Sequence, residues 1–411
     1  MISMQDCGFS PLEKDFADLM VRLAPEGGNA LRWAAALAMN AVEQNHICCD
    51  LAQQIRPREV PENYLQILQE SSAVISAGGT TPLVLDQTRI YLQKMYRKEV
   101  RLAEALRHFA RPREDFDPVR AGTILQKLFP DAPESDLQMQ AVRMAAKNHL
   151  TILSGGPGTG KTYTAGKILA FLREWYGDDL QIAGAAPTGK AAVRLGESLT
   201  GITTSTIHRL LGIDPRSPMP HYRRERKLPY DVVILDEVSM VPLTLMEDFF
   251  AAMPDDGTVI LLGDQDQLSS VEPGAVFADL CAAFRNVPEK GDSFVVSLTE
   301  SRRFPAEGSV AKLSQAIHAV NTLQDAKSAV DLFQAFPEEI EWIDMQDRPQ
   351  ECRKLCQRIR EGYTPLRQAE TPEEALDALD RFRILTTVHR GSYGRNALNA
   401  LSEEVLRIPR S

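Results

Sequence analysis

Two hydrophobic patterns divide the chain. Up to about residue 115, apolar residues recur at helical spacing, as in residues 31–42 and in the charge-rich run 89–109, and this spacing predicts helices. From about residue 134, short uninterrupted apolar runs alternate with amphipathic segments; these runs are 151–153, 180–185, 232–235, 259–262 and 294–298. Such runs are typical of strands that are buried on both faces. We therefore expect an α/β fold with a parallel, helix-covered sheet, preceded by a mainly helical N-terminal domain.

Prolines mark the boundary between the two patterns, at positions 112, 118, 130 and 133. Proline clusters favour turns and linkers over regular elements. The expected parts are a helical interaction domain (1–115), a linker (116–133), the α/β ATPase domain (134–320), a variable connecting segment (321–381) and the start of a second α/β domain (382–411). The N-terminal part shows no catalytic constellation.

A glycine-rich loop follows the first apolar run of the α/β part. Residues 150–169 read LTILSGGPGTGKTYTAGKIL, and the loop fits the pattern GxxxxGK[ST], in which backbone N–H groups surround a polyphosphate at the start of a helix. Lys161 can reach the β- and γ-phosphates, and the Thr162 hydroxyl can bind Mg²⁺. The pattern predicts a RecA-like P-loop NTPase that binds Mg-ATP. The expected cofactor-binding residues are Gly155, Gly156, Pro157, Gly158, Thr159, Gly160, Lys161, Thr162 and Tyr163.

Polar residues at the ends of later apolar runs supply candidate catalytic groups. Asp236 and Glu237 close the run 232–235; Asp236 can hold Mg²⁺ and Glu237 can orient or deprotonate the attacking water. Two adjacent carboxylates at a buried strand end would be costly without a cation. Gln267, after the run 259–262, can bridge the γ-phosphate and the nucleic-acid side because an amide both donates and accepts. Arg303 is a candidate γ-phosphate clamp, with an exposed salt-bridging arginine as the alternative.

Two further groups of residues are weaker candidates. Upstream of the loop, Gln138 can pair with the N6 and N7 atoms of adenine, and Gln140 is its rival for that role. Thr188, Lys190 and Thr206 lie at strand ends and can hold a sugar-phosphate backbone, although by themselves they are ordinary loop residues. The basic run 223–227 favours a solvated loop over a nucleic-acid contact.

Composition narrows the classes of protein. Hydrophobic residues make up 44% and charged residues 25% of the 411 residues, as in an ordinary globular protein. The net charge of −10 argues against coating nucleic acid by bulk electrostatics, but it allows a locally basic groove. There is no apolar run of membrane-spanning length and no secretory signal pattern, so we expect a cytoplasmic protein without a membrane anchor. The six cysteines lack metal-ligand spacing.

The order of the motifs resembles that of the RecD family, the alpha chains of the RecBCD exonuclease V, which are superfamily 1 helicases of the 5′→3′ group. The motifs are DLQ (136–138), GGPGTGKT (155–162), APTGKAA (186–192), TIHRLLG (206–212), DEVSM (236–240), GDQDQLSSVEPGAV (263–276) and SRRF (301–304). The N-terminal stretches PLEKDF, WAAALAMNAVEQNHICCDL and TRIYLQKMYRKE are similar to the RecC-docking domain of the family.

The resemblance implies an ATP-dependent DNA helicase subunit that moves along single-stranded DNA during double-strand break repair and recombination. It implies RecB-like and RecC-like partner subunits. The ATPase roles pass to Gln138, Lys161, Thr162, Asp236, Glu237, Gln267 and Arg303. Contacts to single-stranded DNA pass to Thr188, Lys190, Thr206 and His208. Two alternatives stay open: an ATP-binding docking subunit without motor activity, and another superfamily 1 nucleic-acid motor.

The C-terminal part departs from the family pattern. We expect helices near 348–361 and 372–382, then a strand at 382–388 and a stretch, 389–399, that looks like the opening of the second RecA-like domain. Only 21 residues follow Arg390, whereas such a domain needs on the order of 150. The expectation is therefore an incomplete helicase that hydrolyses ATP weakly by itself, since an arginine finger is worth about 10³ to 10⁵ in rate.

Overall fold

The computed structural model describes most of the chain. The described residues are 3–75, 80–214, 216, 219–267, 270, 272–274, 276–285, 293–299, 308–320, 331, 340–341, 343 and 352–406. The chain divides into two units, Met1–Pro305 and Ala306–Ser411, and each is described by itself.

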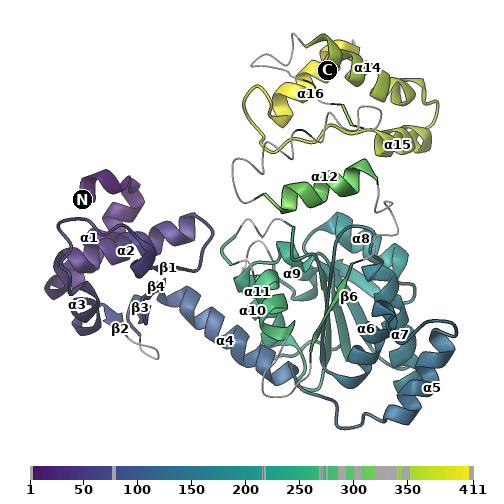
Figure 1. Cartoon of the computed structure of the whole chain (residues 1–411), viewed down its shortest axis with the longest axis horizontal. Helices are drawn as coiled ribbons and strands as arrows, with labels where there is room; N and C mark the ends of the chain where they lie inside the picture. The colour runs from purple at the N-terminus through teal and green to yellow at the C-terminus, as the bar shows by residue number, and fades with distance from the viewer. Residues whose placement is uncertain are drawn as a thin grey trace. The chain divides into compact units, whose positions relative to one another are not determined.

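The N-terminal part of the first unit combines helices with a small sheet (Figure 1). Its elements are η1 (Met4–Cys7), α1 (Pro11–Leu23), η2 (Pro25–Gly27), α2 (Gly28–Glu43), β1 (Cys48–Asp50), η3 (Leu51–Gln53), α3 (Tyr64–Glu70), β2 (Val74–Ile75), β3 (Leu83–Asp86) and β4 (Arg89–Leu92). The four strands form a sheet in the order β1-β4-β3-β2. The helix expected over 31–42 is confirmed within α2. The sheet was not expected, and residues 89–92 belong to β4 rather than to a helix.

Local sequence explains why α1 begins where it does. Ser10 and Glu13 form a capping box, with the Ser10 N–H donating to Glu13 Oε2 at 2.6 Å, which satisfies N–H groups that a helix start leaves unpaired. The alanine-rich α2 buries one long face around Trp33, which packs edge-on against Tyr64 with ring centroids 5.4 Å apart. The small alanine side chains of α2 allow other elements to pack closely against this helix. The N-terminal part has its own hydrophobic core.

Helix α4 (Gln93–Phe109) connects the N-terminal part to the large sheet domain. Its C-terminal half contributes Leu102, Leu106 and Phe109 to a hydrophobic core that otherwise consists mainly of sheet-domain residues. The Phe109 ring lies 5.5 Å, between centroids, from the ring of Phe250 in α10 (Leu243–Ala252). The helix is thus a structural part of both regions.

The large domain is a six-stranded parallel sheet with helices on both faces, as Figure 1 shows. Its strands are β5 (Leu150–Gly155), β6 (Ile182–Ala186), β7 (Thr203–Thr206), β8 (Val232–Leu235), β9 (Thr258–Gly263) and β10 (Val295–Leu298), in the order β10-β5-β9-β8-β6-β7. The helices are α5 (Pro118–Leu128), α6 (Leu137–Lys147), α7 (Lys161–Tyr176), α8 (Gly189–Ser198), α9 (Ile207–Leu210), η4 (Val238–Met240), α10 and α11 (Val276–Arg285). The parallel sheet and all five expected strands are confirmed, and β7 is an addition.

Two cores lie on opposite faces of this sheet. One core joins the sheet to α4, α10 and α11, and the other joins it to α5, α6, α7 and α8. Alternate residues of β5 serve the two faces: Ile152 belongs to the first core and Leu153 to the second, as the two-residue period of a strand requires. The continuous apolar runs of the sequence follow from this double burial.

The stretch expected as a linker, 116–133, contains helix α5. Asp117 caps this helix, since its Oδ1 accepts the N–H of Val119 at 2.8 Å, and Pro118 occupies the first turn. Proline is favoured at that position, because the first N–H groups of a helix have no intrahelical partner. Ile124 and Leu125 are buried in the core beneath α6 and α7. These residues are therefore folded against the sheet domain.

The second unit is helical where the structure describes it, with α12 (Ser309–His318), α14 (Arg353–Gln368), α15 (Pro372–Arg381) and α16 (Arg395–Leu406). The helices expected near 348–361 and 372–382 are confirmed as α14 and α15. The strand expected at 382–388 is wrong, since these residues form no strand. A strand needs a neighbour for its backbone hydrogen bonds, and no described residue pairs with this segment.

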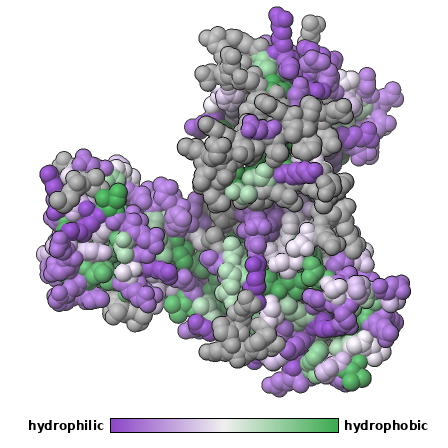
Figure 2. All heavy atoms as spheres, viewed as in Figure 1, coloured by the Kyte–Doolittle hydropathy of each residue, from purple (hydrophilic) through white to green (hydrophobic). Residues whose placement is uncertain are grey.

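On the face shown in Figure 2, the surface of the described residues is largely hydrophilic. In the view of Figure 2, apolar side chains come to the surface in small separate groups. Leu12, Leu19 and Leu23 on α1 are among the exposed apolar side chains. Among the described helices, none is both long and apolar enough to cross a membrane.

Candidate nucleotide-binding site

The predicted site residues gather at one edge of the sheet. Because all six strands are parallel, the segments that follow them leave from the same, carboxyl edge. The glycine-rich loop follows β5, Asp236 and Glu237 follow β8, and Gln267 lies after β9. In the sheet order, β9 lies between β5 and β8. Groups that are about a hundred residues apart in the sequence are thus brought to neighbouring strand ends, where ligands of such sheets bind.

The backbone of the loop requires its glycines. Gly158 and Gly160 have φ angles of 80° and 87°, which side chains other than glycine rarely allow. At Gly155, an added Cβ would lie 2.7 Å from the carbonyl oxygen of Leu298 in β10 and 2.6 Å from Thr159 Oγ1. The loop therefore passes directly beside the end of the neighbouring strand. Its N–H groups are held in a curved path, which is the form of an anion-binding cradle.

Lys161 is already inside this loop. Its Nζ donates to the carbonyl oxygen of Gly156 at 3.1 Å and also contacts the carbonyl oxygen of Gly155. Lys161 is the first residue of α7, so its charge adds to the positive end of the helix dipole. A phosphate in the cradle would replace these carbonyl oxygens as the partner of the ammonium group.

Asp236 and Glu237 form a strained, half-buried pair at the end of β8. Burial raises the pKa of the Asp236 carboxyl; the N–H of Glu237, which donates to Asp236 Oδ1 at 2.9 Å, and the charge of Lys161 oppose this rise. Glu237 has a φ of 52° and a ψ of 41°, a left-handed conformation that costs about 1–2 kcal/mol outside glycine. Such strain persists where surrounding structure imposes it, and it is frequent at functional sites.

The donor set fits Mg²⁺ better than a transition metal. Thr162 offers a hydroxyl and Asp236 a carboxylate, both hard oxygen ligands of the kind that Mg²⁺ prefers. Among the described residues no cluster of three or more His, Cys, Asp or Glu side chains could enclose a metal. This is the donor set of a magnesium ion that keeps water and phosphate oxygens as its remaining ligands.

The two candidate glutamines of α6 lie in different surroundings. The Gln138 side chain is buried, and its Nε2 lies 2.7 Å from the position of an added Cβ on Gly160. Gln140 instead donates from Nε2 to the carbonyl oxygen of Glu134 at 3.1 Å. The difference follows from the helix, because residues two positions apart point to different sides. Gln138 is therefore the glutamine that contacts the loop.

The remaining ATPase candidates are Gln267 and Arg303. The Gln267 side chain is exposed, and its backbone N–H donates to the carbonyl oxygen of Asp264 at 3.3 Å. Asp264 is buried and accepts the N–H of Asp266 at 3.1 Å, so it organises the turn that presents Gln267. Arg303 lies outside the described residues.

The nucleic-acid candidates lie at the ends of β6 and β7, which pair with Ala186 opposite Thr206. Thr188 caps α8 by accepting the N–H of Ala191 at 3.3 Å, and Thr206 caps α9 by accepting the N–H of Arg209 at the same distance. Lys190 and His208 are exposed. The threonine hydroxyls thus have a structural role in capping, and the side chains of Thr188, Lys190 and His208 are exposed to solvent at this edge.

Sequence patterns missed one buried polar residue. Ser239 lies two residues after Glu237, is 7% exposed, and its Oγ has no hydrogen-bond partner among the described residues. Its position directly after the two carboxylates was the only sequence signal. A buried hydroxyl without a partner costs free energy, so Ser239 is a further polar group beside the catalytic pair.

Comparisons with known proteins agree with this site. A family model described as an AAA domain matches residues 138–273. The RecBCD enzyme subunit RecD of Mycolicibacterium smegmatis is 34% identical over 419 residues, which cover 93% of this chain and 70% of that protein. The RecD subunit of Mycobacterium tuberculosis is 32% identical over 416 residues, covering 92% and 67%. The ATP-dependent RecD2 DNA helicase of Deinococcus radiodurans is 41% identical over 196 residues, covering 47% and 26%.

The parallel sheet, the glycine cradle and the paired carboxylates define a P-loop NTPase domain of the RecA-like class. The extent and identity of the match to the mycobacterial proteins go further than this class. The chain belongs to the RecD family of RecBCD enzyme subunits, and the resemblance of its motifs to that family is confirmed.

Proposed function

We propose that this chain is an ATP-dependent DNA helicase subunit that couples ATP hydrolysis to 5′→3′ movement along single-stranded DNA in the cytoplasm. The observation that carries the proposal is the common edge: the nucleotide cradle after β5 and the exposed Lys190 and His208 after β6 and β7 leave the same side of one sheet. Nucleotide-driven changes at the cradle therefore act on elements beside the DNA candidates. By family membership the motor would work within a RecBCD-type complex in double-strand break repair and recombination.

The nucleotide would be held by the cradle from Gly155 to Tyr163, with Gln138 beside it for the adenine ring. ATP with Mg²⁺ supplies the phosphoryl group and the electrophilic charge that hydrolysis needs. Lys161 would bind the β- and γ-phosphates after leaving the loop carbonyls that it now contacts. Thr162 and Asp236 would hold the metal ion through its hydration shell. These residues bind and orient the nucleotide.

Glu237 would take the proton of the attacking water. Its backbone is held in the left-handed region, which sets the direction in which the side chain leaves the main chain. Gln267 would respond to the γ-phosphate from the neighbouring strand end, and Arg303 would add a positive charge as the phosphoryl group transfers. Together with Lys161, these three residues make a proton acceptor, a sensor and two cationic clamps.

DNA would be held by its backbone at the ends of β6 and β7. Lys190 and His208 would contact phosphates, with the capped starts of α8 and α9 behind them. Thr188 and Thr206 contribute by capping these helices and by their own hydroxyls. Such contacts hold a strand without reading its sequence, as a translocating motor requires. The N-terminal part would dock a RecC-like subunit, and a RecB-like subunit would complete the assembly.

The test separates nucleotide binding from turnover. Lys161→Ala should lower ATP affinity about 30-fold or more, because it removes the charge partner of the phosphates. Glu237→Gln should leave affinity intact and lower single-strand-stimulated turnover about 10²- to 10⁴-fold, since only the proton acceptor is lost. Calorimetry measures the first quantity and phosphate release the second.

Lys127→Ala is the matched control, because Lys127 is an exposed lysine on α5 whose partner is the surface residue Glu174. It should change neither quantity. Unchanged affinity in Lys161→Ala, or unchanged turnover in Glu237→Gln, would refute the assignment of the site. Binding of ATP without any stimulation by single-stranded DNA would instead favour a docking subunit over a motor.

A further inference from the structure

The turn between α2 and β1 reaches from the N-terminal part into the loop that follows the catalytic strand β9. The backbone N–H of Gly274 donates to the carbonyl oxygen of Asn45 at 3.1 Å. Asn45 has a φ of 65° and Gly274 a φ of 103°, so both residues of this hydrogen bond have a positive φ, which side chains other than glycine rarely adopt. A Cβ added at Gly274 would lie 2.7 Å from Leu243 Cβ and 3.4 Å from Ile47 Cγ2. Three segments thus meet at Gly274.

Ile47 is the apolar part of this contact. It is partly buried and packs against the core of the sheet domain, although its neighbours in the sequence belong to the N-terminal part. Adding or removing a single methylene group in such a contact disturbs the packing, because protein interiors are close-packed. Ile47 is therefore a residue of the N-terminal part whose side chain packs against the core of the sheet domain.

The two segments that meet the turn both lead to catalytic residues. Gly274 lies in the β9–α11 connection seven residues after Gln267, and Ser270 Oγ donates to the carbonyl oxygens of Glu272 at 2.7 Å and of Gly274 at 3.3 Å. Leu243 is the first residue of α10 and follows Glu237 by six residues, with only the short helix η4 between them. A displacement of the turn therefore acts on the supports of both Gln267 and Glu237.

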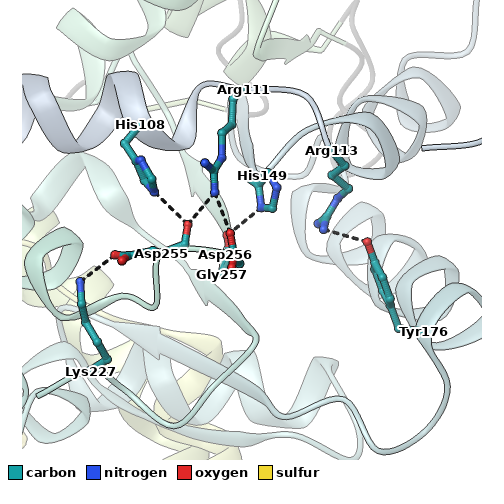
Figure 3. Close-up of polar contacts among 9 residues, drawn as sticks. All are labelled: His108, Arg111, Arg113, His149, Tyr176, Lys227, Asp255, Asp256 and Gly257. Atoms are coloured by element: carbon teal, nitrogen blue, oxygen red, sulfur yellow. Dashed lines mark hydrogen bonds and ion pairs between the residues drawn. The ribbon is translucent and has the colours of Figure 1, made fainter. Parts of the chain in front are cut away.

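The rest of the interface fixes α4 against α10 at two places. At one end, Lys98 Nζ contacts Glu247 Oε2 at 2.8 Å and Asp248 Oδ1 at 3.1 Å, with Glu247 almost fully buried. At the other end, His108 and Arg111 both reach the carbonyl oxygen of Asp255 in the turn before β9 at 2.9 Å, as Figure 3 shows. Among the described residues, the Asn45–Ile47 turn adds to these contacts of α4 a direct contact between the N-terminal part and the β9–α11 connection.

We propose that the Asn45–Ile47 turn is a positioning element for Gln267 and Glu237, so that nucleotide in the cradle and a protein partner on the N-terminal part are energetically coupled. The inference rests on the proposed function, because it concerns regulation of the same ATP site. Coupling of this kind is reciprocal: a partner that shifts the turn changes nucleotide affinity by the factor by which nucleotide changes partner affinity. Asn45 acts through its backbone and Ile47 through its side chain, and neither touches the nucleotide.

The experiment compares two isoleucine variants of the full chain. Ile47→Ala removes the side-chain contact with the core of the sheet domain. Ile55→Ala is the matched control, because Ile55 lies in the same N-terminal part and is 72% exposed. The readout is hydrogen exchange of the Gly274 amide, the donor to Asn45, with and without Mg-ADP and aluminium fluoride. In the parent chain and in Ile55→Ala the nucleotide should change this exchange rate about fivefold or more. In Ile47→Ala the nucleotide-dependent change should disappear.

A second readout separates positioning from binding. Turnover should fall about tenfold in Ile47→Ala while nucleotide affinity stays within about twofold, because the turn supports the groups that act in the transition state. Ile47→Val, which keeps the branched shape, should restore most of both responses, and melting temperatures identify any variant that is simply unfolded.

The outcomes distinguish this inference from the proposed function. A parent chain that binds nucleotide but shows no change at the Gly274 amide overturns the coupling alone, as does an Ile47→Ala response equal to that of Ile55→Ala. A parent chain that binds no nucleotide overturns the proposed function, and the coupling with it.

Discussion

Neighbouring glycines of the cradle differ in what surrounds them. At Gly155 an added Cβ would meet the Leu298 carbonyl oxygen at 2.7 Å, whereas at Gly156 it would meet nothing within 4 Å. A backbone oxygen in a sheet cannot move without moving its strand. We predict that Gly155→Ala costs about 1–3 kcal/mol through overpacking and lowers nucleotide affinity about tenfold or more as the loop shifts.

Gly122→Ala is the control for this prediction, because it adds the same methyl group to α5, outside the cradle, at a position with nothing within 4 Å. Calorimetric affinities and unfolding temperatures of the two variants, measured side by side, provide the test. Equal affinities would mean that the loop does not need its close approach to β10.

At Asp236, the effect of pH on stability can be measured separately from the effect of Mg²⁺ on nucleotide affinity. Burial raises its pKa above the ordinary value of a free carboxyl, so between these two values the folded chain binds more protons than the unfolded chain. The contribution of this group to the free energy of unfolding therefore falls as the pH rises from the ordinary carboxyl pKa to the raised pKa, and it stays constant above the raised pKa. At neutral pH without Mg²⁺, the buried charge is a cost.

We predict that Asp236→Asn raises the melting temperature of the nucleotide-free chain at neutral pH and removes the Mg²⁺ dependence of nucleotide affinity. The substituted side chain keeps the oxygen that accepts the N–H of Glu237. In the parent chain, Mg²⁺-dependent affinity should fall with decreasing pH as the carboxyl takes up its proton. Differential scanning calorimetry and binding titrations over a pH series measure both effects. A lower melting temperature of Asp236→Asn would contradict the role of burial.

At the scale of whole elements, burial determined which strands could be predicted from the sequence. Five strands of the large sheet carry continuous apolar runs because both of their faces are covered, and those strands were predictable. Strand β7 (Thr203–Thr206) lies at one edge of the sheet and, unlike β10 at the other edge, is only partly buried, so its residues carry no apolar run. The pairing of β7 with β6 forms it, and pairing is not visible in a local pattern.

The N-terminal strands were missed for the same reason. They have two to four residues each, too few for a two-residue period to stand out. Residues 89–92 (RIYL) lead directly into the charge-rich α4, and only their pairing with β3 and β1 makes them a strand. Conversely, the residues 382–388 have a strand-like composition without a partner. A strand is a property of two segments, whereas helices such as α2 are encoded within one.

Sequence order was more informative for the candidate site than for these boundaries. The loop, the carboxylates and the glutamines of α6 were proposed because each role needs particular residue types at short spacing, and the loop and the carboxylates follow strands that end at one edge of the sheet. The choice between Gln138 and Gln140 required the orientation of α6. Ser239 and the Asn45–Gly274 contact required packing, since no local pattern indicates which buried atom lacks a partner or which distant turn reaches a loop.

At the scale of the whole molecule, helix α4 makes the two regions of the first unit interdependent. The sequence suggested a boundary at residue 115, yet α4 ends at Phe109 after placing three large apolar side chains in the sheet-domain core. Loss of a single such side chain costs about 2–5 kcal/mol. Removing α4 would also leave Glu247 buried without Lys98, and an orphaned buried charge costs about 3–5 kcal/mol more.

We therefore predict that a chain beginning at residue 116 does not fold, whereas one beginning at residue 93, which keeps all of α4, folds and binds nucleotide. The summed losses in the shorter chain exceed the roughly 5–15 kcal/mol that stabilises a typical domain. Circular dichroism melting and calorimetric titration of the two truncated chains measure the difference. A folded, nucleotide-binding chain 116–411 would mean that the sheet domain completes its core without α4. In that case α4 would be an attachment to the ATPase rather than a part of it.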